Sequence, residues 1–263
     1  MLKEKAMPFE IPTRHNEKLR TLVERINQDA ELTQLWRCAN INAIDRLGLS
    51  DHGEVHIRIV ANAALKLLRL LIEADIQPSV VTNYDLTHED AEVVVTMGSC
   101  LHDIGIAIHR DEHELFSVAL GYPKARELLE GIYQEPELTI MAAESLHAVI
   151  AHQWDMPCLT LEAGVVKVAD ALDMTAGRSR IPFEAGKVNI HSVSALAVES
   201  VTIERGEERP VKIEITMTNS AGIFQVDELL KRKLQNSSIY PYVEVVARIK
   251  GKTEQRILGV YKL

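Results

Sequence analysis

The spacing of apolar residues changes once along this chain, and the change limits the folds that the chain can adopt. From about residue 17 to residue 177, apolar residues recur mainly at three- and four-residue intervals, which is typical of helices. After residues 182–186 the interval shifts toward two, as in Val211–Met217 and Val243–Ile249, which is typical of half-buried strands. The sequence therefore predicts a mainly α protein in which an all-α bundle precedes a small α+β region.

We place the boundary between the two expected domains at the Pro- and Gly-containing segment near residue 182. The predicted helical domain covers residues 1–182. The predicted α+β domain covers residues 188–263, and its spacing also predicts a helix over Val226–Leu234. The strands around Val211 and Val243 would offer edges for pairing, so we expect this domain to serve oligomerisation or regulation.

Capping residues and prolines predict where several helices begin and end. Thr87, with Asp90 three residues later, has the pattern of a capped helix start. A helix that opens at 111–114 is expected to end at Pro123, because proline interrupts a helix interior. Another helix is expected to follow Thr160 and to end at Gly177.

Composition excludes several classes of protein. With 29 basic and 38 acidic residues, the formal net charge is −9, which does not favour an extended nucleic-acid surface. No run approaches the ~20 apolar residues of a membrane helix, and the N-terminus lacks the apolar centre of a secretory signal, so we expect a cytoplasmic location and no membrane partner. The three cysteines form no C-x-x-C pair, which argues against a disulfide framework or a cysteine zinc site.

Histidine and aspartate residues recur at the ends and on the apolar faces of the predicted helices. A buried carboxylate such as Asp103 is costly unless a cation compensates its charge. Helical bundles build metal sites from inward-facing ligands on neighbouring helices, and imidazole with carboxylate suits iron, manganese, zinc or cobalt. The candidate ligands, each on a different helix except for one adjacent pair, are His56, His102, Asp103, His113, His152 and Asp170.

This ordered set resembles the HD-domain metal-dependent phosphohydrolase superfamily. The segment Leu101-His102-Asp103-Ile104-Gly105 is similar to its central motif. Ala148-Val149-Ile150-Ala151-His152 and Val168-Ala169-Asp170-Ala171-Leu172-Asp173 resemble the later motifs of the bacterial subgroup that cleaves dinucleoside polyphosphates. The likeness covers about residues 50 to 180 and implies an all-α HD-domain bundle.

The resemblance also implies a dimetal centre. Asp103 would bridge two divalent ions, His56, His102 and Asp170 would complete one site, and His113 with His152 would hold the other ion. Iron or manganese is expected first, with magnesium, zinc, cobalt or nickel as alternatives. A hydroxide between the metals would attack the phosphorus atom.

Three of these assignments have neighbouring alternatives in the sequence. His109 lies one helical turn before His113, His147 lies five residues before His152, and Asp173 follows Asp170 by three residues. In addition, Asp51 could orient a ligand imidazole from behind.

Basic residues near the last motif are candidates for substrate binding. Lys167 lies three residues before Asp170, on nearly the same helical face, and is expected with Asp103 to act in catalysis or to bind a phosphate; a purely structural role is the alternative. Arg178 and Arg180 follow Gly177 and could bind a phosphate in bidentate fashion.

The expected function is hydrolysis of a phosphoester or phosphoanhydride in a small phosphorylated compound, with nucleotides as candidates. A di-iron oxygenase of the same superfamily is an alternative, because it would use the same ligand types. A non-catalytic nucleotide-sensing module, with the C-terminal region as output, is a third hypothesis.

Overall fold

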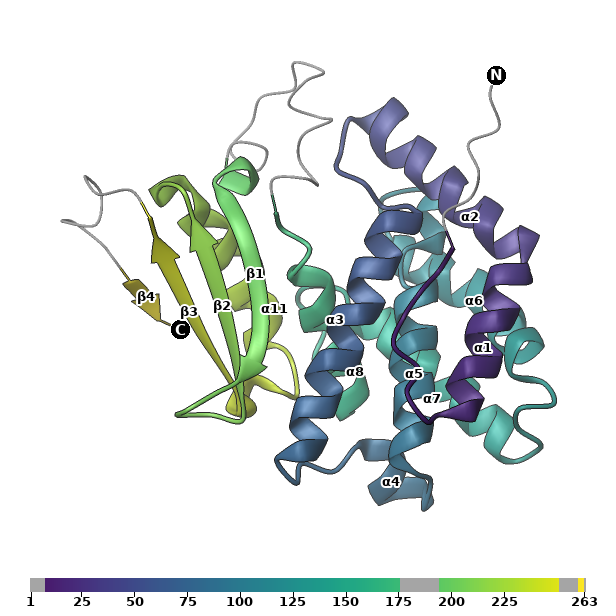
Figure 1. The fold of residues 1–263 in the computed structure, drawn as a ribbon. Coiled ribbons are helices and arrows are strands. Elements are labelled where there is room, and N and C mark those ends of the chain that lie inside the picture. Colours follow the sequence, from purple (N-terminus) through teal and green to yellow (C-terminus); the bar gives the residue numbers. More distant parts are fainter. Residues whose placement is uncertain (1–7, 176–193, 251–259, 263) are drawn as a thin grey trace.

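The part of the chain before residue 176 folds into helices, as its apolar spacing predicts. The computed structural model describes residues 8–175, 194–250 and 260–262 (Figure 1). The helical elements in this part are α1 Glu17–Gln28, α2 Ala30–Asn40, the π-helical turn η1 Ile41–Leu47, α3 Glu54–Glu73, α4 Ser79–Tyr84, α5 His88–Leu101, the 3-10 turn η2 Ile104–Ala107, α6 His113–Leu129, α7 Glu137–Ala151 and α8 Leu161–Ala171.

Helix α5 is the centre of the bundle. Nearly all of its residues after the first turn are buried, and it contacts α1, α3, α6, α7 and α8. A helix that is apolar on all sides has to be surrounded by other elements. The central position of α5 places its C-terminal end, at His102, inside the bundle rather than at the surface.

Two predicted helix starts are confirmed by their capping contacts. Asp90 donates its backbone N–H to Thr87 Oγ1 over 3.3 Å, and the Thr87 N–H donates to Asp90 Oδ2 over 2.9 Å, which completes a capping box. At the start of α8, Ala163 donates its N–H to Thr160 Oγ1 over 3.2 Å. These caps set which residues of α5 and α8 reach the end of the bundle.

The prediction that Pro123 ends a helix is wrong. Pro123 lies inside α6, which continues to Leu129. A proline in a helix interior costs about 3 kcal/mol, because it removes a hydrogen bond and crowds the preceding turn. The residues after it offset this cost: Leu128 is buried, and Lys124 Nζ pairs with Asp29 Oδ2 at 2.9 Å.

Helix α8 also ends at Ala171 rather than at Gly177, which lies outside the described residues.

The C-terminal region contains a sheet of four described strands, β1 Val198–Arg205, β2 Val211–Met217, β3 Val243–Ile249 and β4 Val260–Lys262, in the order β1-β2-β3-β4. Strands β2 and β3 are parallel, with Ile213 opposite Val245, and the two outer pairs are antiparallel. The crossover between β2 and β3 carries the 3-10 turn η3 Ser220–Gly222, the π-helical turn η4 Gln225–Leu230, helix α11 Lys231–Gln235 and the 3-10 turn η5 Tyr240–Tyr242.

Both alternating runs form strands as predicted, and both lie in the interior of the described sheet. Strands β2 and β3 are the two central strands, so each pairs with a neighbour on both sides. Strand β1, which was not predicted from the sequence, pairs with the outer edge of β2. Strand β1 pairs along the whole of β2, whereas β4 pairs with β3 only at Val246–Arg248, so oligomerisation through this region stays a prediction.

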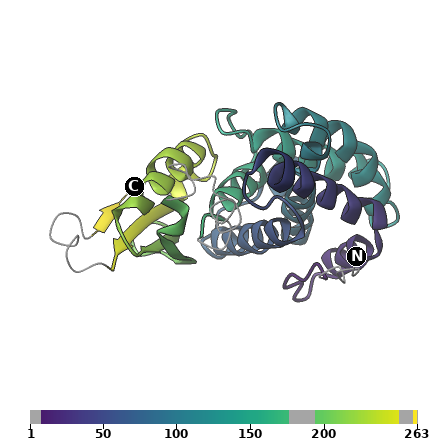
Figure 2. The ribbon, with the colours of Figure 1, turned by 90° about the horizontal axis from the view of Figure 1, so that it is seen from above.

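The sheet region lies beside the helical region rather than on its end, as two perpendicular views show (Figures 1 and 2). Strand β1 contacts α3, and α11 contacts α8. The crossover between β2 and β3 thereby approaches the C-terminal end of α8.

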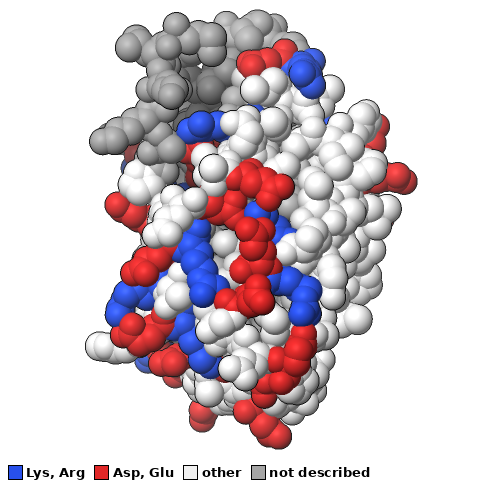
Figure 3. Space-filling model, turned by 90° about the vertical axis from the view of Figure 1, so that its right-hand side faces the viewer, with Lys and Arg blue, Asp and Glu red and all other residues white. Residues whose placement is uncertain are grey.

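One face of the surface and the hydropathy of the helices can be compared with the composition. On the face that carries α1 and α2, acidic and basic side chains lie next to one another, with no broad area of basic residues (Figure 3). Among the described residues, every helix is too short or too polar to cross a membrane.

Candidate metal centre

Five helix ends meet at one place in the bundle. Helices α3 and α6 begin there, and α5, α7 and α8 end there. The C-terminal ends of helices carry partial negative charge and favour cations. The side chains that these ends bring together are His56 on α3, His102 and Asp103 at the end of α5, His113 on α6, His152 at the end of α7 and Asp170 on α8.

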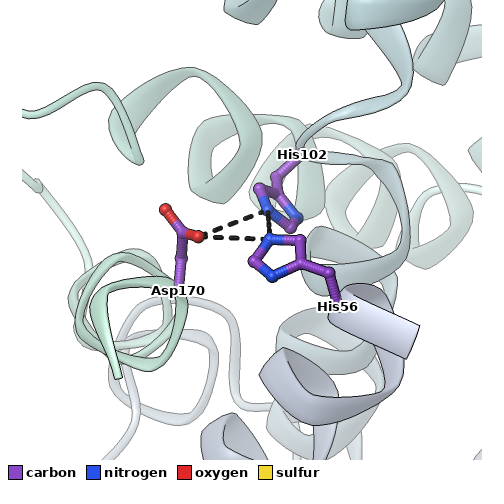
Figure 4. A group of neighbouring side chains, drawn as sticks. All are labelled: His56, His102 and Asp170. Atoms are coloured by element: carbon purple, nitrogen blue, oxygen red, sulfur yellow. Dashed lines mark hydrogen bonds and ion pairs between the residues drawn. The ribbon is translucent and has the colours of Figure 1, made fainter. Parts of the chain in front are cut away.

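The first group consists of His56, His102 and Asp170 (Figure 4). The Nε2 atoms of His56 and His102 are 3.2 Å apart. Asp170 Oδ1 lies 3.3 Å from the first of these atoms and 3.8 Å from the second. Three donor atoms from three helices thus face one small volume, and both imidazoles are fully buried.

The second group consists of Asp103, His113 and His152. His113 Nε2 lies 3.1 Å from Asp103 Oδ1 and 3.2 Å from His152 Nε2. His152 Nε2 is 3.7 Å from the same carboxylate oxygen. All three residues are buried, so this group also presents its donor atoms within the protein.

Asp103 connects the two groups. Its Oδ1 atom faces His113 and His152, whereas its Oδ2 atom lies 3.2 Å from His102 Nε2 and 3.4 Å from His56 Nε2. A carboxylate in this position can serve two cations at once, one through each oxygen. The geometry matches the bridging position expected for Asp103.

The imidazoles of the first group are oriented by oxygen acceptors behind them. His56 Nδ1 donates to Asp173 Oδ2 over 2.7 Å, and His102 Nδ1 donates to the Ser99 carbonyl oxygen over 2.8 Å. With the Nδ1 protons committed to these acceptors, the two Nε2 lone pairs face each other at 3.2 Å. Such a contact is repulsive unless a cation or a proton lies between the rings, and the donor set therefore fits a metal ion.

The charges of the site favour bound cations. Burial disfavours the charged form of His102, but Asp103 and Asp170 outweigh burial and raise the pKa of His102 to about 9. Burial opposes ionisation of Asp170 as well, yet Lys233 and His102 hold the pKa of Asp170 well below its usual range. Burial and the neighbouring charges of His102 and Lys233 lower the pKa of His152 well below the usual histidine value. The carboxylates are therefore ionised and the centre attracts positive charge.

The structure distinguishes the alternatives that the sequence left open. His113 and His152 belong to the second group, whereas His109 is exposed and accepts the Asp111 N–H over 3.0 Å. His147 accepts the Leu159 N–H over 3.0 Å.

Asp173 and Asp51 both contact His56 from outside the first group. Asp170 faces the imidazoles, and Asp173 lies behind His56. Asp51 accepts the backbone N–H of His56 over 3.1 Å and so contacts the start of α3. Asp173 therefore orients the imidazole of His56, the role that the sequence predicted for Asp51.

Lys167 lies away from the cavity, where it would have to lie to bind a phosphate or to act in catalysis. Its side chain is fully buried and its ammonium donates to the Met156 carbonyl oxygen. Burial lowers the pKa of Lys167. It is not among the residues that line the cavity at the centre. Arg178 and Arg180 lie outside the described residues.

The cation beside Asp170 comes instead from the C-terminal region. Lys233 on α11 forms an ion pair with Asp170 Oδ2. The sequence signals for Lys233 were the basic run Lys231-Arg232-Lys233 and the predicted helix that carries it. Neither signal indicates that this helix folds back onto the end of α8.

A cavity of about 710 Å³ opens over the centre. Asp103, His113, His152 and Asp170 form part of its wall from the helical region. The crossover of the C-terminal region supplies another part of the wall: Phe224, Gln225, Glu228, Leu229, Arg232 and Lys233. The volume suits a small molecule, and the site is complete only with both regions.

Comparisons with known proteins agree with this placement. A family model described as "HD domain" matches residues 54–175, which span all six side chains of the two groups. An uncharacterized protein of Methanocaldococcus jannaschii is 42% identical over 228 residues, which cover 87% of this chain and 88% of the relative. No solved structure matches the chain.

Proposed function

Because the chain belongs to the HD-domain superfamily, we propose that it is a metal-dependent phosphohydrolase that cleaves a phosphoester or phosphoanhydride bond in a small molecule, with nucleotides as candidate substrates. The observation that carries this proposal is the position of Asp103 between two groups of donors. One carboxylate oxygen faces each group, and the cavity opens over both.

The donor set assigns six side chains to two cations. His56, His102 and Asp170, with Asp103 Oδ2, would hold one ion, and His113 and His152, with Asp103 Oδ1, would hold the other. Nitrogen and oxygen donors without thiolate favour iron, manganese, zinc or cobalt over soft metals. When bound, two such cations activate a water molecule and neutralise charge on the phosphoryl oxygens.

The protein's own groups orient the site. Asp173 and the Ser99 carbonyl oxygen keep the rings of His56 and His102 in one tautomer and one orientation. His152 is held in the same way, since its Nδ1 donates to the Val149 carbonyl oxygen over 2.5 Å. These contacts fix the donor atoms before a substrate arrives.

The cavity wall offers both charge and apolar surface to a substrate. Arg110, Arg232 and Lys233 are cationic and suit phosphate oxygens. Phe224 and Leu229 provide apolar surface for the organic part of the molecule. A small phosphorylated compound with an apolar or aromatic group matches this wall.

The test is metal analysis of anaerobically purified protein, followed by hydrolysis assays with nucleotides, dinucleoside polyphosphates and phosphate monoesters under added Mn²⁺ or Fe²⁺. We expect about two metal ions per chain and release of phosphate that depends on the metal. Absence of bound metal together with absence of turnover would overturn the proposal. Substrate-dependent O₂ uptake in the iron-loaded protein would favour the oxygenase instead.

A further inference from the structure

Lys233 occupies a position that the proposed reaction can use. Asp170 presents Oδ1 to the imidazoles of the first group, and its other oxygen, Oδ2, forms the ion pair with Lys233. The Lys233 side chain is 18% exposed and lines the cavity. An ammonium group therefore stands at the border between the candidate metal centre and the space for a substrate.

The position of Lys233 is fixed by contacts of its helix with the helical region. Arg232 lies over the Trp154 ring at 5.2 Å, and Asn236 Nδ2 donates to the Trp154 carbonyl oxygen over 3.2 Å. Asn236 also accepts the Cys158 N–H through its carbonyl oxygen over 3.2 Å. Helix α11 is thus attached to the segment between α7 and α8, and Lys233 does not behave as a solvated surface lysine.

The formal charges around the centre indicate that Lys233 can contribute to binding an anionic substrate. Two divalent cations would bring four positive charges to Asp103, Asp170 and Asp173, which together carry three negative charges. In the wall, Arg232 pairs with Glu228 at 3.1 Å, and Arg110 and Glu114 carry opposite formal charges. Lys233 adds one positive charge, so the loaded centre would carry two net positive charges before a bound hydroxide is counted and one with it, which favours an anionic phosphate.

We propose that Lys233 binds the terminal phosphate dianion of the substrate, so that the C-terminal region makes the enzyme prefer phosphomonoesters and terminal phosphates over phosphodiesters. This inference rests on the proposed function. A diester has one negative charge fewer and carries a substituent on the oxygen that would face the ammonium group. Lys233 would release Asp170 to the metal and turn to the phosphate, which keeps its charge paired throughout.

The first test compares hydrolysis of p-nitrophenyl phosphate and bis(p-nitrophenyl) phosphate by the manganese-loaded full-length protein. For Lys233→Gln, we expect KM for the monoester to rise about 10- to 100-fold, as for loss of a charge-assisted hydrogen bond, with little change for the diester. Lys233→Arg keeps the charge and should retain most of the preference. Equal losses on both substrates would show that Lys233 acts only through Asp170 and would overturn the inference.

A matched control is available on the same helix. Lys231 pairs with Asp227 at 2.8 Å, is 36% exposed and does not line the cavity. Lys231→Gln should leave the ratio of monoester to diester turnover unchanged. A similar fall in that ratio for Lys231→Gln and Lys233→Gln would assign the effect to overall charge and overturn the inference.

Calorimetric titration of inorganic phosphate into the manganese-loaded protein separates this inference from the proposed function. If the wild-type protein turns over esters and binds phosphate, and Lys233→Gln does both equally well, the inference fails and the proposed function stands. If the wild-type protein binds phosphate without turnover and Lys233→Gln loses binding, Lys233 is a phosphate ligand, but the proposed function fails and the preference for phosphomonoesters fails with it. If the wild-type protein neither binds phosphate nor turns over an ester, both fail.

Discussion

His56 and Asp173 are 117 residues apart in the chain, and His56 Nδ1 donates to Asp173 Oδ2 over 2.7 Å inside the protein. The contact keeps the proton of His56 on Nδ1 and directs the Nε2 lone pair toward His102 and Asp170. The contact also makes the Nε2 atom of His56 a stronger ligand for a metal ion. The position of Asp173 is therefore as important for the geometry of the site as the position of His56 itself.

Asp173→Asn keeps the size of the side chain and removes its charge. We expect metal affinity to fall about 10- to 100-fold, as is usual when an acceptor behind a ligating histidine is lost. Titration with Mn²⁺ or Co²⁺ measures the change. The exposed Asp85, at the end of α4, provides a matched control, and Asp85→Asn should bind metal like the wild-type protein. Unchanged affinity in Asp173→Asn would contradict the orienting role.

Asp103→Asn should have a larger effect, because Asp103 faces both groups of donors. We expect metal affinity to fall by more than about 100-fold at both sites and turnover to fall with it. Metal content measured after dialysis checks the first expectation, and the assay on a phosphate monoester checks the second. Retention of two ions per chain would show that Asp103 does not bridge them.

Metal binding should release protons near neutral pH. In the metal-free protein, burial disfavours charged His102, but Asp103 and Asp170 prevail and raise its pKa to about 9. A metal ion needs the unprotonated nitrogen, so it displaces this proton, and the apparent affinity should rise with pH up to about 9. Calorimetry in buffers of different ionisation enthalpy counts the protons. A binding enthalpy that is independent of the buffer would contradict this prediction.

The same shift predicts the pH dependence of stability without metal. Because the folded-state pKa of His102 lies above the ordinary value of 6.5, its contribution is complete below pH 6.5 and is lost as pH rises to about 9. The free energy of unfolding of the metal-free protein should fall by about 3 kcal/mol over this interval. Denaturant unfolding at several pH values in the presence of a chelator measures it. The metal-loaded protein should lack this fall, since the metal replaces the proton.

Gly105 allows η2 to pack closely against α6 at His113. A Cβ atom on Gly105 would lie 2.1 Å from the His113 carbonyl oxygen and 2.4 Å from the Ser117 nitrogen. Both contacts are with backbone, so Gly105→Ala should destabilise the fold by about 3 kcal/mol and weaken metal binding through His113. Thermal unfolding and metal titration measure the two effects.

Gly121→Ala is the control for this substitution. Its Cβ atom would meet the end of the Leu146 side chain at 3.1 Å, and that side chain can move. Stability should therefore change by less than about 1 kcal/mol. Equal effects of the two substitutions would contradict the prediction that the backbone contacts at Gly105 exclude a Cβ atom.

The helix starts could be predicted from sequence because capping signals are local, and the candidate ligands could be predicted because their order resembles a known family. Capping residues such as Thr87 and Thr160 mark helix starts through contacts within one turn. The His102-Asp103 pair and its distant partners appear in a fixed order along the chain. Pro123 shows the limit of such rules, because the packing of Leu128 and the ion pairs of Lys124 outweigh the local preference.

The amino-acid sequence alone was sufficient to identify a helical bundle, an α+β region after it and the set of residues for a metal centre. It could not identify which cation stands beside Asp170, because the spacing favours Lys167 and no local signal places Lys233 of the crossover helix against α8. It could not separate the tasks of Asp170 and Asp173 either. These choices depend on contacts between elements far apart in the chain, which only the packed structure determines.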